Sequence, residues 1–118
     1  MMTRVWIVIG GVMGALAVAA AAYSAHAPIE PARLRAVSSA VQMQGWHALA
    51  LVACGLVGSG WPVHVAGTLF LLGTLLFAGA VWVPQFGGPP LGITAPVGGT
   101  MLMAGWLALA VAGLTARG

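Results

Sequence analysis

Two polar side chains near the middle of a long apolar segment are the strongest candidates for chemistry in this sequence. Gln44 and His47 lie three residues apart in the run QMQGWHALAL, residues 42–51, so a helix would place them on one face. Polar groups at membrane depth are costly and need partners. We therefore expect His47 to be a neutral imidazole, hydrogen-bonded to Gln44, a backbone carbonyl or a threonine, with the other helices packed around this face.

Other chemistry finds little support in the residues. Hydrolytic catalysis needs a nucleophile, a base and an orienting group, but the sequence contains no aspartate and a single glutamate, Glu30, at a segment end. His26, His47 and His64 fall on separate helices or their ends, without the cysteines or carboxylates that would complete a metal shell. We predict that the protein is not an enzyme and holds no metal or cofactor; haem ligation by His47 stays open as an alternative.

Composition points to a membrane protein. Of the 118 residues, 61% are hydrophobic and 4% are charged, whereas a soluble domain carries about 25% charged residues. Nucleic-acid binding needs clustered positive charge, and four scattered arginines do not supply it. Residues 1–118 are therefore expected to form a single integral membrane domain, in which the lone Cys54 packs among small residues.

Four apolar segments are long enough to cross a bilayer, at about residues 5–25, 38–58, 63–83 and 97–116. The first imitates a secretory signal that ends in an A-x-A cleavage site at residues 25–27, but its length favours a retained span. Residues 32–37 form an amphipathic lead-in to the second segment. The predicted fold is an all-α membrane protein, an antiparallel bundle of four transmembrane helices with a short interfacial helix that leads into the second span.

Smaller features of these segments carry further expectations. Pro84 is expected to stop the third helix and to open a long uncharged loop, residues 85–96. Small residues four apart, such as Gly10 and Gly14, predict close helix packing. Thr68 and Thr74 are each expected to bond a carbonyl of their own preceding turn. Four spans place both termini on one side, with two arginines at each face, so the positive-inside rule selects neither orientation.

Four stretches of the sequence together resemble a known family. The segment QGWHALAL, residues 44–51, is similar to the Q-x-x-H-A-L-A-L signature of family 423 among the domains of unknown function, which contains bacterial YgdD-like and eukaryotic transmembrane protein 256-like proteins. The pair Ala25-His26, the segment AGTLFLLGTLLFAG (66–79) and the segment LGITAPVGGTMLMAG (91–105) followed by Trp106 agree in the same order. Ala95, inserted before Pro96, and Ala27, where the family usually has glycine, depart from the pattern.

The resemblance implies a multi-pass protein of the bacterial plasma (inner) membrane with no known activity. The family motif maps onto eight residues here: His26, Gln44, His47, Thr94, Pro96, Gly98, Gly99 and Trp106. We expect His26 and the 91–99 loop to meet above the face that carries Gln44 and His47. The candidate site is thus a buried polar cluster of His26, Gln44, His47 and Thr94.

The function predicted from these observations is that of a structural or accessory subunit of a membrane complex or homo-oligomer. Its partners would be membrane lipid and other membrane subunits or further copies of itself, because almost no chain lies outside the spans to hold a soluble partner. Two alternatives stay open. One is lipid, quinone or haem binding near His47, and the other is a minimal channel or transporter.

Overall fold

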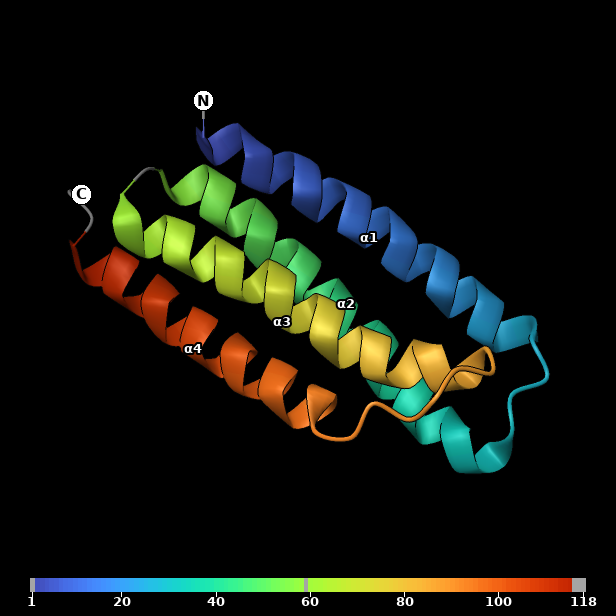
Figure 1. Ribbon diagram of the computed structural model, residues 1–118. Helices are drawn as coiled ribbons and strands as arrows, with labels where there is room; N and C mark the ends of the chain where they lie inside the picture. The colour runs from blue at the N-terminus through green and yellow to red at the C-terminus, as the bar shows by residue number, and fades with distance from the viewer. Residues whose placement is uncertain (1, 59, 116–118) are drawn as a thin grey trace.

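The described chain is built of transmembrane-length helices. The computed structural model describes residues 2–58 and 60–115, which fold into α1 (Met2–His26), α2 (Pro31–Val57), α3 (Trp61–Gln85) and α4 (Thr94–Thr115) (Figure 1). Each helix is long and apolar enough to cross a membrane. The prediction of an all-α membrane bundle is confirmed.

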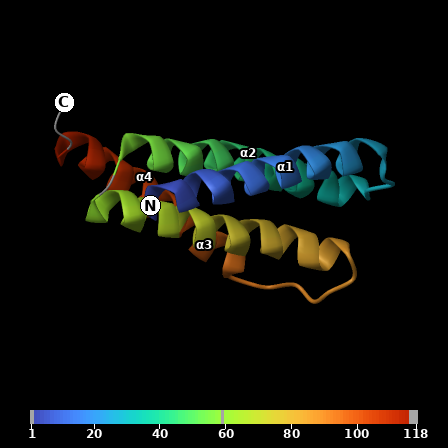
Figure 2. The same cartoon turned by 90° about the horizontal axis from the view of Figure 1, so that it is seen from above.

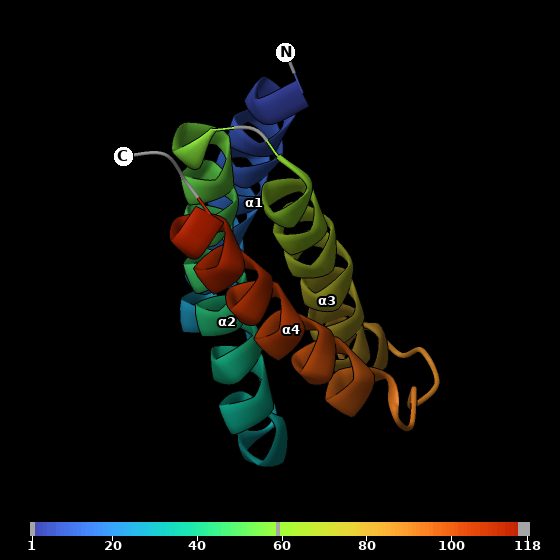
Figure 3. The same cartoon turned by 90° about the vertical axis from the view of Figure 1, so that its left-hand side faces the viewer.

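The helices pair as two antiparallel hairpins. α1 packs along α2 and α3 packs along α4, while α2 and α3 hold the two hairpins together. Figures 2 and 3 show α1 running beside α2, with α3 across from them and α4 beside α3. The bundle measures 49 × 26 × 18 Å, so its long axis exceeds the roughly 30 Å of a hydrocarbon core.

Prolines mark the helix ends, though not always where the pattern suggested. α2 begins at Pro31 and runs without a break through the expected interfacial lead-in. α3 continues one residue past Pro84, to Gln85. α4 begins at Thr94, three residues before the predicted start at Val97. Pro96 is tolerated there because it falls in the first turn, where backbone N–H groups have no partner within the helix and a proline therefore loses no hydrogen bond. The loop is correspondingly shorter than expected.

Glycines let the helix backbones touch within each hairpin. A Cβ on Gly73 of α3 would lie 2.9 Å from the carbonyl oxygen of Gly98 on α4, and a Cβ on Gly98 would lie 2.7 Å from that of Gly73. In the other hairpin, a Cβ on Gly10 would lie 2.8 Å from the Ala48 carbonyl oxygen. Close packing stabilises helices in lipid, where no hydrophobic force joins them.

The core lies where the helices of the two hairpins meet. Leu51, Cys54, Ala66 and Phe70 have no exposed surface. Their side chains fill the space between the hairpins, and His47, 3% exposed, lies among them. A close-packed apolar interior therefore positions His47.

Candidate functional site

His47 is buried and uses both of its ring nitrogens in hydrogen bonds. Nδ1 lies 2.6 Å from the carbonyl oxygen of Met43, one turn earlier on α2. Nε2 lies 3.0 Å from the indole nitrogen of Trp106 on α4. An indole N–H can only donate, so Nε2 accepts and the ring proton is on Nδ1, which donates to Met43. The geometry fixes His47 as the neutral imidazole expected from the sequence.

Aromatic rings enclose this imidazole. The His47 ring centre lies 5.5 Å from that of Phe70 and 5.8 Å from that of Trp106, and the Phe70 and Trp106 rings meet edge to face at 5.0 Å. Because the one lone pair of the ring accepts from Trp106, His47 has no free nitrogen with which to ligate a metal or haem iron. The hydrogen bond to Trp106 joins α2 to α4.

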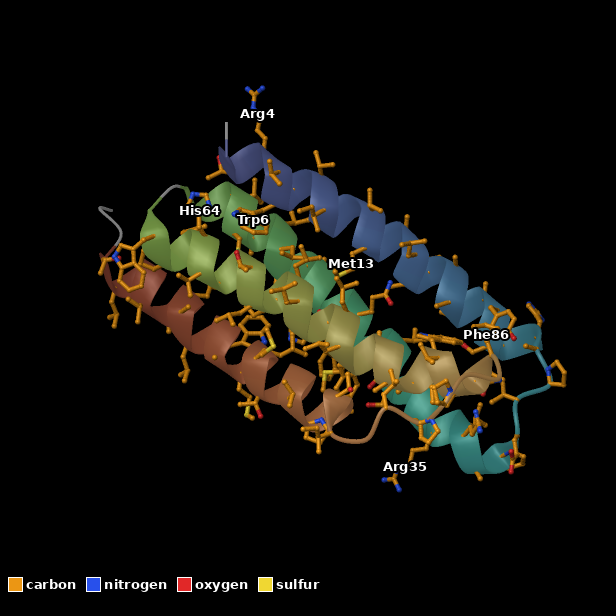
Figure 4. All side chains as sticks on the ribbon, viewed as in Figure 1. Arg4, Trp6, Met13, Arg35, His64 and Phe86 are labelled. Atoms are coloured by element: carbon orange, nitrogen blue, oxygen red, sulfur yellow. The ribbon has the colours of Figure 1, made fainter. Side chains whose placement is uncertain are left out.

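A second tryptophan–histidine pair joins the other two helices. The indole nitrogen of Trp6 on α1 lies 3.0 Å from Nδ1 of His64 on α3. Figure 4 shows the two side chains pointing toward one another across the gap between α1 and α3. The Trp6 ring also covers Gly67, where a Cβ would lie 2.6 Å from Cδ2 of the indole. Each pair therefore bridges helices of different hairpins, α1 to α3 and α2 to α4.

Gln44 turns toward α1 rather than toward His47. Its Nε2 donates to the carbonyl oxygen of Met13, 3.0 Å away. The bond satisfies one amide hydrogen and ties the centres of α1 and α2 together. No hydrogen bond joins Gln44 to His47, although they share one side of α2.

The other two residues of the expected cluster lie near helix ends. His26 is exposed at the end of α1. The Thr94 hydroxyl donates to the Leu91 carbonyl oxygen, 2.7 Å away, at the start of α4. Twelve residues of α4, about 18 Å of helix, separate Thr94 from Trp106, which bonds His47. The structure therefore does not gather His26, Gln44, His47 and Thr94 around one point.

Sequence reasoning did not identify Trp106 or Trp6 as partners of the histidines. Trp106 stood among the residues of the family motif, but nothing in its surroundings pointed to His47, 59 positions away. His64 was placed on a separate helix or at its end, and no partner was predicted for it. Only the packing of the two hairpins brings these rings together.

Comparison with known proteins decides the family. The family model described as "Protein of unknown function (DUF423)" matches residues 18–99. The chain belongs to the DUF423 family. The matched range contains α2 and α3 in full and parts of α1 and α4, together with Gln44 and His47.

Staphylococcal relatives agree with the DUF423 assignment over nearly their full length. The UPF0382 membrane protein of Staphylococcus haemolyticus is 27% identical over 114 residues, covering 92% of this chain and 93% of its own. A UPF0382 membrane protein of Staphylococcus epidermidis (strain ATCC 12228) is 29% identical over 121 residues, covering 98% and 99%. One from Staphylococcus aureus is 28% identical over 117 residues, covering 92% and 94%. No solved structure matches this DUF423 chain.

Proposed function

We propose that this DUF423 protein is a structural or accessory subunit of an assembly in the plasma (inner) membrane, formed with further copies of itself or with a larger complex, and that it works without a catalytic site of its own. The observation that carries the proposal is the position of Trp46. Its side chain is 56% exposed and lies near the middle of α2.

An indole at this depth calls for a protein partner. Trp46 is eleven residues from Val57 at the end of α2, about 16 Å at 1.5 Å per residue. Tryptophans in membrane proteins concentrate at the two interfaces, where the indole N–H reaches water or headgroups. The indoles of Trp6 and Trp106 donate to histidines, whereas the Trp46 N–H has no acceptor among the described residues. In hydrocarbon it would stay unpaired, which costs free energy.

A furrow between α1 and α2, on the side of α2 that carries Trp46, could accommodate a helix of another subunit. The furrow, of about 450 Å³, is lined by residues that include Gly11, Gly14, Gly45 and Leu49. Leu49 lies three residues after Trp46, on the same side of the helix. Nothing lies within 4 Å of a Cβ added at Gly11 or Gly45, so the furrow is open at these two positions. Buried tryptophans often dominate the free energy of protein–protein binding. An exposed anchor next to a smooth furrow supports an interface on this face.

The interior supports a structural role in the same way. His47, Gln44, Trp6 and His64 each make a hydrogen bond to another helix of the bundle. Among the described residues, none of these bonds pairs a nucleophile with a base. The arrangement supports a structural role for these polar side chains.

Native gels in mild detergent test the proposal. We expect the wild-type protein to migrate well above its 11.8 kDa chain mass, and Trp46→Leu to shift it to the monomer, because the variant keeps an apolar surface but loses the indole. The matched control is Leu107→Ala, which shortens another exposed side chain, 69% exposed, on α4, and should leave migration unchanged. Co-purification of two differently tagged copies tells self-assembly from a foreign partner.

A wild-type protein that is monomeric at every detergent concentration would contradict the proposal. So would a Trp46→Leu variant that assembles as well as the wild type. Equal losses in Trp46→Leu and Leu107→Ala would show general destabilisation rather than an interface at Trp46.

A further inference from the structure

A second groove lies between α1 and α3, away from Trp46. It has a volume of about 480 Å³, with walls from Val8 to Leu16 on α1 and from Leu71 to Trp82 on α3. The Trp6–His64 hydrogen bond closes the space between the helices beyond one end. At the other end Tyr23 meets Trp82 edge to face, at 6.0 Å between ring centres. Figure 4 shows Trp6 and Phe86 marking the two ends, with Met13 between them.

One residue that lines the groove has a buried hydroxyl without a hydrogen-bond partner. Thr74 lines the groove, is 2% exposed, and its Oγ1 is without a partner among the described residues. Four other hydroxyls within helices bond their own preceding turn: Ser24 to Ala20, Thr68 to His64, Thr100 to Pro96 and Thr115 to Val111. The expectation for Thr68 therefore holds, and that for Thr74 was wrong. Because buried hydroxyls are nearly always hydrogen-bonded, the Thr74 hydroxyl is available to donate to an acceptor outside its own helix.

Gln44 adds a second polar group on the floor of the same groove. Its amide nitrogen is held by Met13, which fixes the side chain in place. Its carbonyl oxygen Oε1 accepts no hydrogen bond from a described residue, and Gln44 lines the groove with Thr74. The lining thus includes one amide oxygen and one residue, Thr74, whose unpaired hydroxyl is buried behind the groove surface. The other walls are apolar, and no charged residue lines the groove.

The depth of these groups limits what can reach them. Gln44 lies thirteen residues from each end of α2, and Thr74 lies eleven or more from each end of α3. At 1.5 Å per residue, both are roughly 16 Å or more from the helix ends, near the bilayer midplane. Phospholipid headgroups and their ester carbonyls stay at the interface, and both ends of the groove are closed. An occupant must enter sideways from the hydrocarbon and carry an uncharged oxygen.

We propose that this groove binds an uncharged, hydrocarbon-soluble amphiphile of the isoprenoid quinone class, a compact ring that carries carbonyl or hydroxyl oxygens. On binding, the Thr74 side chain turns about its Cα–Cβ bond, and its hydroxyl donates to a ring carbonyl. Oε1 of Gln44 accepts from a ring hydroxyl when the reduced form is bound. The volume of about 480 Å³ lies within the range of small-molecule sites, roughly 300–1,000 Å³. His47 takes no part, because both of its ring nitrogens are occupied.

Binding of decylubiquinone to the purified protein in detergent tests this site. Quinones quench nearby indoles, and Trp82 lines the groove, so a saturable loss of tryptophan fluorescence reports binding. Gly79→Leu should reduce affinity at least tenfold, because Gly79 lines the groove and a Cβ there meets nothing within 4 Å, so the new side chain fills the groove without disturbing the fold. Thr74→Val, which removes only the hydroxyl, should reduce affinity about fivefold, the value of one hydrogen bond.

The matched control is Gly113→Leu, a position on α4 that also has open space around it and does not line the groove; it should bind as the wild type does. Circular dichroism and thermal melting confirm that each variant is folded. Unsaturable quenching, unchanged affinity in Gly79→Leu, or equal competition by phosphatidylglycerol would overturn the proposal. Trp46→Leu should keep full affinity, so failure of the assembly proposal and failure of this one are distinguishable.

Discussion

The indole N–H of Trp106 lies 3.0 Å from Nε2 of His47, although 59 positions separate the two residues in the chain. Trp106 is on α4 and His47 is on α2, in different hairpins. Neither group has another partner for this bond within the described chain, so its geometry depends on how the hairpins pack. The presence of this hydrogen bond therefore reports whether the two hairpins are packed as in the structure.

Trp106→Phe should destabilise the bundle by about 1–3 kcal/mol, because it leaves Nε2 of His47 buried and unpaired. The free energy of unfolding can be measured by titrating sodium dodecyl sulfate into the protein in mixed micelles and following circular dichroism. Trp61→Phe is the control. Trp61 is 71% exposed at the start of α3, and its loss should change the free energy by less than about 0.5 kcal/mol.

The double variant His47→Leu with Trp106→Phe should recover part of that loss, since removing both partners leaves no polar group unpaired. The coupling free energy from the double-mutant cycle is the relevant quantity. Costs that simply add would show that the two side chains do not depend on one another.

Gly73→Ala should destabilise the α3–α4 hairpin by about 1–3 kcal/mol through overpacking, because its Cβ would lie 2.8 Å from a Leu102 methyl carbon and 2.9 Å from the Gly98 carbonyl oxygen. Gly113→Ala, where nothing lies within 4 Å, should be neutral or stabilising by up to about 1 kcal/mol, as alanine favours helix. Dodecyl sulfate titration measures both. Equal effects at the two positions would show that the hairpin tolerates wider spacing.

Cys54 should resist alkylation in the folded protein, because its side chain has no exposed surface. N-ethylmaleimide added to the purified protein in mild detergent should modify it only after denaturation, which mass spectrometry detects as one added reagent. Glu30→Cys, between α1 and α2, supplies an accessible thiol in the same chain and should react at once. Rapid reaction of Cys54 without denaturant would mean that the core opens readily.

The order of helices fixes which loops share a membrane side. With Cys54 replaced by alanine, Glu30→Cys and Ile93→Cys should react with a membrane-impermeant maleimide from one side, and Trp61→Cys from the other. Glu30 and Ile93 lie in loops at the same end of the bundle, and Trp61 starts α3 at the opposite end (Figure 1). Labelling of intact cells and of inverted vesicles measures this, and labelling of all three from one side would exclude four spans.

The helices could be predicted because long apolar segments have few alternatives in a membrane. The start of α4 could not, since Pro96 reads equally well as the end of a loop or as a first-turn residue, and only the structure shows that Thr94 begins the helix. Helix existence follows from composition, whereas helix boundaries depend on local contacts.

The polar residues show the same division. Burial and neutrality of His47 follow from its place in an apolar segment, and one predicted kind of partner, a backbone carbonyl, is present in Met43. Three residues on a helix correspond to about 300°, so Gln44 and His47 diverge by about 60°, enough for one to face α1 and the other α4. Which helix lies next to which is a property of tertiary packing that residue spacing does not encode.

The two diagonal bonds distribute complementary groups across the halves of the chain. The α1–α2 half holds one indole donor, Trp6, and one imidazole acceptor, His47, while the α3–α4 half holds the reverse partners, Trp106 and His64. In each half alone, the indole N–H and the imidazole nitrogen of these pairs would lack their hydrogen-bond partners in lipid, and the other half supplies both partners. Halves cut between α2 and α3 and made as separate polypeptides should therefore associate in the bilayer. Two copies of the same half do not match in this way, because Trp6 lies four residues from its helix end and His47 ten residues from the end on the same side.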